Sequence, residues 1–322
     1  MDQINWSFMS ESGPATSPLL RSHLVAYAGL CLIWGSTWLA IRVVVQDVPP
    51  LEAAAIRFLV GGLLLVGLSL AQRRRWPREG RSWRAILILS ATIMAVPYGL
   101  LFWAEQHVLS SMAAILFSAM PLMVALLTPV MMGRKVPRNA VFALVVGFGG
   151  LLVLLFTELR TSRSELLGGA AVMAAMMLSA WSIVYAKKTL QEVDSVVSTG
   201  LQLLLGSAAL FWGRWALEAH RQAHWSGASL AALAFLTIFG SCLAFVVYYW
   251  LLKRIEPYQL STTSLIVPVI AVLEGALFYR EQVSLTMLVA MAVVLISVGS
   301  VLRAEAVSER PSDILMLRSK TP

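Results

Sequence analysis

The chain has 322 residues, of which 58% are hydrophobic and only 13% are charged, and its mean hydropathy is +0.77. Soluble proteins are close to half apolar and a quarter charged, so this composition excludes an ordinary soluble domain and indicates a membrane protein. The net charge of +8 comes from basic residues that lie mostly in tails and short loops, such as RRRWPREGRSWR. No stacking aromatics or recognition helix accompany this charge, so we expect no nucleic-acid partner.

The first 22 residues, MDQINWSFMSESGPATSPLLRS, carry Asp2 and Glu11. They lack the basic start and apolar core of a secretory signal, so we predict a polar tail at residues 1–22. A second polar tail is predicted at 303–322. Both tails are expected on the cytoplasmic side.

Long apolar runs follow one another from residue 24 onward. A hydrocarbon core of about 30 Å requires roughly 20 apolar residues in a helix. Because a spanning segment must satisfy its own backbone hydrogen bonds, each run predicts a helix. The fold class is therefore an all-α integral membrane protein with ten transmembrane helices, at 24–44, 53–71, 84–104, 109–132, 138–156, 167–186, 197–215, 229–252, 258–279 and 283–302.

The distribution of Lys and Arg sets the expected orientation. If the N-terminus is inside, the inner tails and loops hold 18 of the 25 basic residues. This bias follows the positive-inside rule and predicts a multi-pass protein of the bacterial inner (plasma) membrane with both termini in the cytoplasm.

The two halves of the chain resemble each other. A shift of 147 positions places Pro121 over Pro268, each following Ser/Thr residues in an apolar run. Two repeats of five helices are expected, at 23–156 and 167–302. Because five is odd, the second repeat must enter the membrane inverted, which is the plan of many secondary transporters with a central cavity between repeats.

Three segments carry a family resemblance: IWGSTWLAIR, PPLEAAAIRF (49–58) and LLKRIEPYQLSTTSLIVPVIAVLEGALFYREQVS (251–284). Together they resemble the EamA family of the drug/metabolite transporter superfamily, in its bacterial ten-helix type. The resemblance implies ten helices around a central cavity and movement of small metabolites or toxic compounds across the inner membrane. One departure is Arg134, where the first repeat of the family often has an acidic residue.

The first predicted helix contains Trp34, Trp38 and Arg42, spaced by four residues, with Ser36 between the indoles. Such spacing places the three side chains along one slowly drifting stripe. If the stripe faces the cavity, it offers flat apolar walls, an indole donor and a cation. In the alternative, Trp38 faces lipid, and Gly35 and Ser36 allow a neighbouring helix to pack closely.

Four ionisable residues fall within or at the ends of predicted spans: Arg42, Arg57, Glu105 and Glu274. With the orientation above, all four lie toward the periplasmic side. A charge at membrane depth costs about 2.5–3.5 kcal/mol on insertion scales, so it normally faces protein or water. We expect these groups either to pair as structural staples or to form a gate, and Glu274 is a candidate proton carrier.

Prolines and aromatic residues complete the candidate site. Pro97, Pro121 and Pro268 lie inside predicted spans, where a missing backbone donor favours a helix break. Breaks at matching positions of two repeats point to a binding site between them. Tyr98, Trp103, Trp181 and Tyr248 are further candidates for the cavity wall, with anchoring at the membrane interface as the alternative.

These features favour a secondary transporter that exports small metabolites such as amino acids, or amphipathic toxic compounds, by alternating access. Two other hypotheses remain: an intramembrane enzyme, and a membrane receptor or assembly factor without transport. The sequence has no Walker motif and no His or Cys spacing typical of a metal site, so we expect no catalytic residues, no metal and no cofactor. The expected partners are the lipid bilayer, a small-molecule substrate and a proton. Substrate identity and oligomeric state are left open.

Overall fold

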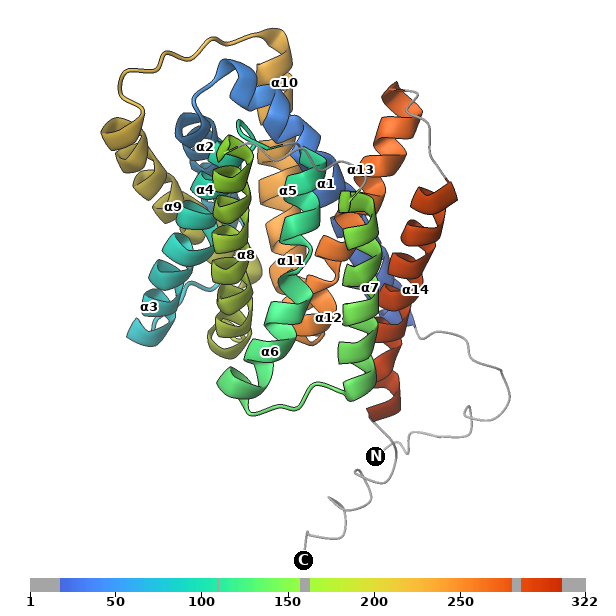
Figure 1. Ribbon diagram of the computed structural model, residues 1–322. Coiled ribbons are helices and arrows are strands. Elements are labelled where there is room, and N and C mark those ends of the chain that lie inside the picture. Colours follow the sequence, from blue (N-terminus) through green and yellow to red (C-terminus); the bar gives the residue numbers. More distant parts are fainter. Residues whose placement is uncertain (1–17, 109, 157–162, 280–284, 309–322) are drawn as a thin grey trace, which may run out of the picture.

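The structure is a computed structural model that describes residues 18–108, 110–156, 163–279 and 285–308 (Figure 1). The described residues form helices joined by short loops. The helices are α1 (Pro18–Asp47), α2 (Pro50–Ala71), α3 (Gly80–Leu89), η1 (Ser90–Ala95), α4 (Val96–Ala104), α5 (Ser110–Phe117), α6 (Met120–Met132), α7 (Arg138–Phe156), α8 (Arg163–Thr189), α9 (Ser195–Leu217), α10 (Gly227–Phe235), η2 (Leu236–Leu243), α11 (Ala244–Leu252), α12 (Pro257–Ser261), α13 (Thr263–Tyr279) and α14 (Leu285–Ser308).

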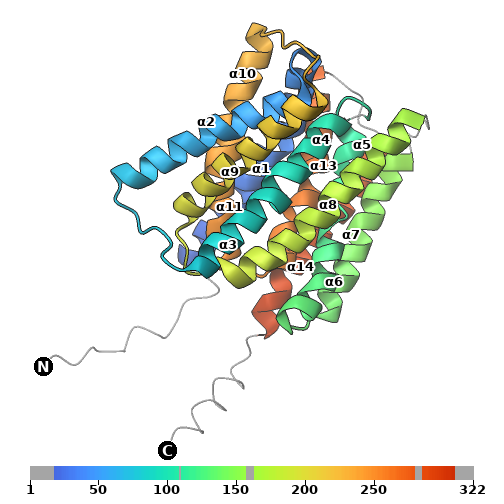
Figure 2. The same cartoon turned by 90° about the vertical axis from the view of Figure 1, so that its left-hand side faces the viewer.

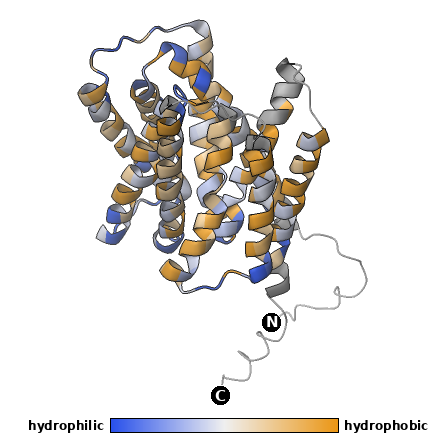
Figure 3. Ribbon diagram, in the orientation of Figure 1, coloured by the Kyte–Doolittle hydropathy of each residue, from blue (hydrophilic) through white to orange (hydrophobic). Residues whose placement is uncertain are grey.

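The predicted all-α membrane fold is confirmed. Eight helices among the described residues are long and apolar enough to cross a membrane, and α7 is a shorter apolar helix. The predicted span 258–279 is divided between α12 and α13 by a turn at Thr262. Figure 3 shows hydrophobic residues along the helices and hydrophilic residues concentrated toward the two ends of the bundle.

The two repeats run in opposite directions. In Figure 1, α1 rises from the end of the molecule where α14 finishes, whereas α8 descends toward that same end. At this end, which we call the terminal end, Arg74 of the α2–α3 loop meets Asp194 of the α8–α9 loop. At the opposite end, the backbone N–H of His224 donates to the carbonyl of Asp47. An odd number of passes per repeat produces this inversion.

Helix packing follows an approximate two-fold symmetry between the repeats. In the first repeat α1 packs on η2, α11 and α13 of the second, and in the second repeat α8 packs on η1, α4 and α6 of the first. The equivalent helices α2 and α9 pack on each other, as do α7 and α14. Figure 2 shows α2 lying along α9. These two pairs of equivalent helices flank the central helices.

Small residues allow α2 to approach α9 closely, and likewise α7 to approach α14. A Cβ added at Gly62 would lie 2.7 Å from Cγ of Leu204 and 2.9 Å from its backbone nitrogen. A Cβ at Gly147 of α7 would lie 2.4 Å from Oγ of Ser297 on α14. Membrane helices depend on van der Waals packing because lipid offers no hydrophobic gain, so close contacts at small residues hold these pairs together.

The structure adds a feature that the sequence did not predict. The third and eighth passes each contain a π-helical segment, η1 and η2, and a shift of 147 positions nearly superimposes the two ranges. The first has a proline, Pro97, two residues after its end, whereas Ala244 occupies the equivalent position at the end of η2. Proline therefore does not explain both segments. Such segments are frequent at functional sites in other proteins.

The predicted helix breaks at prolines need correction. Pro97 lies two residues after the end of η1, in the first turn of α4, and Pro121 lies in the first turn of α6, just after a break at residues 118–119. Pro268 lies inside α13, which continues past it without a break. The interruption in this pass is at Thr262, where the hydroxyls of Ser261 and Thr262 donate to backbone carbonyls three residues earlier. These side-chain bonds satisfy carbonyls near the interruption.

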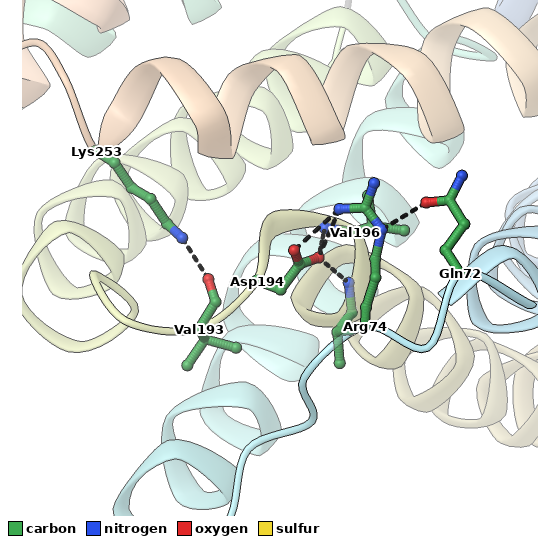
Figure 4. A network of polar contacts seen from close by, with 7 residues as sticks. Gln72, Arg74, Val193, Asp194, Val196 and Lys253 are labelled. Atoms are coloured by element: carbon green, nitrogen blue, oxygen red, sulfur yellow. Dashed lines mark hydrogen bonds and ion pairs between the residues drawn. The ribbon is translucent and has the colours of Figure 1, made fainter. Parts of the chain in front are cut away.

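A polar network joins the repeats at the terminal end (Figure 4). Nη1 of Arg74 donates to Oδ2 of Asp194 at 2.9 Å, and Oδ1 of Asp194 accepts from the backbone N–H groups of Val196 and Val197 at 2.8 and 3.2 Å. Lys253 donates to the carbonyl of Val193. Burial lowers the pKa of the Lys253 ammonium, and the charge of Asp194 opposes this effect. Asp194 is therefore both an ion-pair partner and the N-cap of α9.

Substitution at Asp194 separates these two roles. Asp194→Asn keeps a good N-cap and loses the ion pair, whose partly exposed charges stabilise by about 1 kcal/mol or less. Asp194→Ala loses both, and a lost cap costs about 0.5–2 kcal/mol more. We expect thermal unfolding in detergent to show a clearly lower Tm for Asp194→Ala than for Asp194→Asn. An equal decrease in Tm in the two variants would show that the ion pair, and not the N-cap, stabilises the protein.

Candidate substrate-binding cavity

A cavity lies between the repeats, and its empty volume is about 830 Å³ when the space open at its mouth is included. It is lined by passes one, three and four of the first repeat and by their equivalents, passes six, eight and nine, of the second. The lining residues are Trp34, Thr37, Trp38, Ile41, Ile93, Tyr98, Leu101, Ala114, Phe117, Met120, Ser179, Ile183, Phe245, Tyr248, Ser261, Thr263, Ser264 and Val267. Spaces between the helices of a bundle are common sites for small molecules.

Aromatic rings form much of the wall. Trp34 lies edge-on to Phe245, with ring centroids 5.7 Å apart, and its centroid is 5.3 Å from that of Tyr248. Trp38 packs edge-on against Phe117 at 6.0 Å. These contacts are within the range of favourable aromatic pairs. The rings thus offer a flat apolar surface to a small ligand.

Hydroxyl groups supply the polar part of the lining. Thr37 donates to the carbonyl of Trp34 at 2.7 Å, Thr263 to that of Leu260 at 3.0 Å, and Ser264 to that of Ser261 at 2.9 Å. Because each hydroxyl donates to a backbone carbonyl three residues earlier, its oxygen retains lone pairs that can accept a further hydrogen bond. These side chains therefore act as acceptors toward a ligand.

Two buried donors of the lining complement these acceptors. Nε1 of Trp34 and the hydroxyl of Tyr248 have no hydrogen-bond partner among the described residues. A buried polar group without a partner costs about 1–3 kcal/mol. Both groups line the cavity, so a ligand with an acceptor group can satisfy them there.

Arg57 lies directly behind this wall. Its residue is 1% exposed, and Nε donates to Oγ of Ser241 at 2.6 Å. Its Cζ lies 5.2 Å from the ring centroid of Tyr98, a lining residue. Arg57 was predicted either to pair with an acidic residue or to form part of a gate, and its contacts among the described residues are a hydroxyl and aromatic rings.

The structure brings together four of the predicted site residues: Trp34, Trp38, Tyr98 and Tyr248 all line the cavity. The other predicted residues whose side chains are described lie outside its lining. Ser36 donates to the carbonyl of Leu32, Trp103 stacks on His107 and Trp181 stacks on Tyr185. Arg42 and Arg57 also lie outside the lining, and the side chain of Glu274 is not among the described residues.

Sequence reasoning missed several lining residues. Thr37 follows Trp34 by three residues, and Phe245 precedes Tyr248 by three, so each lies on the same helix face as a predicted residue. Both Thr37 and Phe245 would have been found by including the residues one helical turn away from each aromatic candidate. Phe117 is harder to predict from the sequence, because its position depends on the helix break at residues 118–119.

Comparison with known proteins matches this architecture to one family. The profile of the EamA-like transporter family matches the chain twice, over residues 22–156 and 166–303. The chain belongs to the EamA-like transporter family. The two matches together cover both sets of helices that form the cavity wall, so the family assignment applies to the whole membrane bundle.

Several relatives are similar to this chain over most of their length. The uncharacterized transporter YoaV of Bacillus subtilis is 27% identical over 82% of this chain and 91% of its own. Protein PagO of Salmonella typhimurium is 27% identical over 75% and 80%. The uncharacterized inner membrane transporter YedA of Escherichia coli K12 is 27% identical over 85% and 88%. A protein crystal structure with a TM-score of 0.72 and 19% identity covers 94% of this chain and 99% of its own, which establishes similarity of fold.

The expected family is therefore confirmed, and the chain is a multi-pass membrane protein of a transporter family. Its cavity lies where the two matched repeats meet, which is where many transporters of inverted-repeat design bind substrate.

Proposed function

We propose that this chain is a secondary transporter of the bacterial inner membrane that exports small amphipathic metabolites, such as amino acids, by alternating access. The observation that carries the proposal is the cavity between the inverted repeats, with apolar rings, hydroxyl acceptors and two buried donors without partners. A ligand with an apolar body and a compact polar group suits this lining. The symmetric packing of α1 and α8 provides two similar arrangements for opening toward either side.

The terminal end is proposed to face the cytoplasm. The basic loops at this end include Arg74, Arg134 and Lys253, and their contacts with Asp194, Glu256 and Val193 place four loops together. The charge bias of these loops supports the orientation through the positive-inside rule.

Proton coupling is also part of the proposal, with Glu274 as the proton carrier. This assignment depends on the sequence alone, which places a carboxylate inside a predicted span. Ionisable residues at such depth commonly take part in proton relays.

Counterflow in proteoliposomes tests the proposal. Vesicles that contain the purified protein are loaded with one unlabelled amino acid and diluted into a trace of the same labelled compound. We expect transient accumulation of label for some members of an amino-acid panel. An imposed pH gradient should drive uptake or efflux in the wild type, and Glu274→Gln should lose this response while retaining counterflow. Failure of every amino acid and amphipathic test compound to exchange would contradict transport.

Direction is tested in cells. Overproduction should raise tolerance to toxic amino-acid analogues and lower their accumulation, because export reduces the internal concentration. Increased sensitivity and accumulation would instead indicate import.

A further inference from the structure

Arg57 is a buried cation, and its contacts among the described residues include no acidic side chain. It lies in α2 and is 1% exposed, and Nε donates to Oγ of Ser241, its one hydrogen bond to the described part of the chain. Its Cζ is 5.4, 5.2 and 5.9 Å from the ring centroids of Phe58, Tyr98 and Phe102. Aromatic faces attract a guanidinium, but each supplies far less than a full counter-charge. The local charge thus remains only partly compensated.

The guanidinium also has unused hydrogen-bonding capacity. Nη1 is buried and has no partner among the described residues. The ion pairs found in the described part of the chain join Arg74, Arg134 and Arg214 to acidic residues, and Arg57 is not among them. A buried charge is normally paired or hydrogen-bonded, because desolvation otherwise costs several kcal/mol. A residue held in this way needs a reason beyond helix packing.

An aromatic residue of the cavity wall contacts this guanidinium. Tyr98 lines the cavity, and it also contacts Phe245 of the opposite repeat at 5.9 Å between centroids. Tyr98 is half-buried, unlike Arg57. A change in the Tyr98 rotamer would therefore bring Nη1 into contact with a ligand in the cavity.

Gly240 of η2 makes room for the guanidinium. A Cβ at this position would lie 3.0 Å from Nη2 of Arg57 and 3.0 Å from Cγ2 of Thr37. Thr37 lines the cavity. The π-helical segment thus supplies both the hydroxyl that fixes Arg57, at Ser241, and the small residue that gives it space. Arginine presents several donors in a planar fork that matches a carboxylate.

The charge at the terminal end is consistent with an anionic ligand. A second, open hollow is lined by Arg134, Lys187, Lys188 and Lys253 together with uncharged residues. Clefts lined by one sign of charge raise the local concentration of ligands of the opposite sign.

We propose that Arg57 binds the carboxylate of the substrate, so the transported compounds are carboxylates or zwitterionic amino acids with an apolar body. This inference rests on the proposed transport function and specifies its substrate class. The carboxylate contacts Nη1 after Tyr98 turns aside, and the apolar body stays between the rings of Trp34 and Trp38. Arg57 is thereby a specificity-determining residue.

Matched ligands test this assignment. Isothermal titration calorimetry measures ligand binding to the purified protein in lipid nanodiscs. One ligand pair is 3-phenylpropionate and 3-phenylpropionamide, which differ mainly in charge. The other pair is phenylalanine and phenylalaninamide. Each carboxylate should bind about 10- to 100-fold more tightly than its amide, the range expected for a charge-assisted hydrogen bond. Arg57→Gln should remove this preference and leave amide affinity close to wild type. Arg214→Gln, which alters an ion-paired arginine outside the cavity, should retain the preference.

Several results would overturn the assignment. A wild-type protein that binds each amide as well as its carboxylate, or that binds no carboxylate of the panel, contradicts it without any variant. Retention of the preference in Arg57→Gln also contradicts it. If Arg57→Gln does not fold, Gly240→Ala displaces the guanidinium with a smaller change and should weaken carboxylate binding selectively, and failure to do so would contradict the assignment. Counterflow of an uncharged or cationic compound together with these results would refute the carboxylate class but leave transport intact.

Discussion

Replacing Trp34 by alanine is expected to reduce counterflow by about 30-fold or more, the effect of removing a dominant binding side chain. The indole forms one wall of the cavity, contacts Phe245 and Tyr248, and carries a buried N–H with no partner among the described residues. Trp34→Phe keeps an aromatic ring but lacks the donor, so we expect an intermediate loss. Initial rates in proteoliposomes at equal protein content measure the effect.

Trp212 provides a matched control for this substitution. It lies on α9, is 71% exposed and is not among the cavity-lining residues. Trp212→Ala removes the same side chain and should leave counterflow near the wild-type rate. If Trp34→Ala and Trp212→Ala transported equally well, the cavity would not be the substrate site.

Gly62→Ala is expected to destabilise the protein by about 1–3 kcal/mol, as overpacking of a tight interior does. The added methyl group would meet the side chain of Leu204 and also its backbone nitrogen, which cannot move without shifting α9. Unfolding in detergent, followed by heat or by titration with sodium dodecyl sulfate, measures the change.

Gly67 on the same helix is the matched control. No atom lies within 4 Å of a Cβ added at Gly67. Gly67→Ala should therefore be neutral or stabilise by up to about 1 kcal/mol, because alanine favours helix more than glycine does. A similar loss of stability at both positions would show that close α2–α9 packing is not what holds the pair.

The sequence predicted the architecture well because hydrophobic run length and internal repetition are strong signals in membrane proteins. It predicted positions on helix faces less well. On an ideal helix of 3.6 residues per turn, a four-residue step drifts by about 40°, so Arg42 is turned by about 80° from Trp34. This drift agrees with the structure, in which Trp34 and Trp38 line the cavity and Arg42 does not.

The same geometry explains two other differences. Trp103 follows Tyr98 by five residues, which places it about 140° around α4, whereas Leu101 lies about 60° from Tyr98 and lines the cavity. Trp181 is about 160° from Ser179 on α8 and is likewise outside the lining. An aromatic residue in an apolar run is therefore weak evidence for a place in the cavity wall. The face of the helix that lines the cavity must first be known from at least one of its residues.

The π-helical segments and the turn at Thr262 could not be predicted from local sequence. A proline rule gave Pro268 as a break, but α13 continues through it, and η2 forms without a proline beside it. The contact between the hydroxyls of Thr262 and Tyr27 and the approach of Arg57 to Ser241 depend on the folded bundle. Tertiary contacts decide these features.

The central claim is that one cavity between the repeats opens in turn to the two sides of the membrane. Its most direct test is a single cysteine at Ser179, a lining residue, in a protein with Cys31 and Cys242 replaced by alanine. A membrane-impermeant thiol reagent should label Ser179→Cys when applied from either face in separate experiments, and substrate should slow both reactions. Ser207→Cys, buried in α9 outside the lining, should react from neither face. Labelling of Ser179→Cys from one face only, or from neither, under every substrate condition would contradict the account.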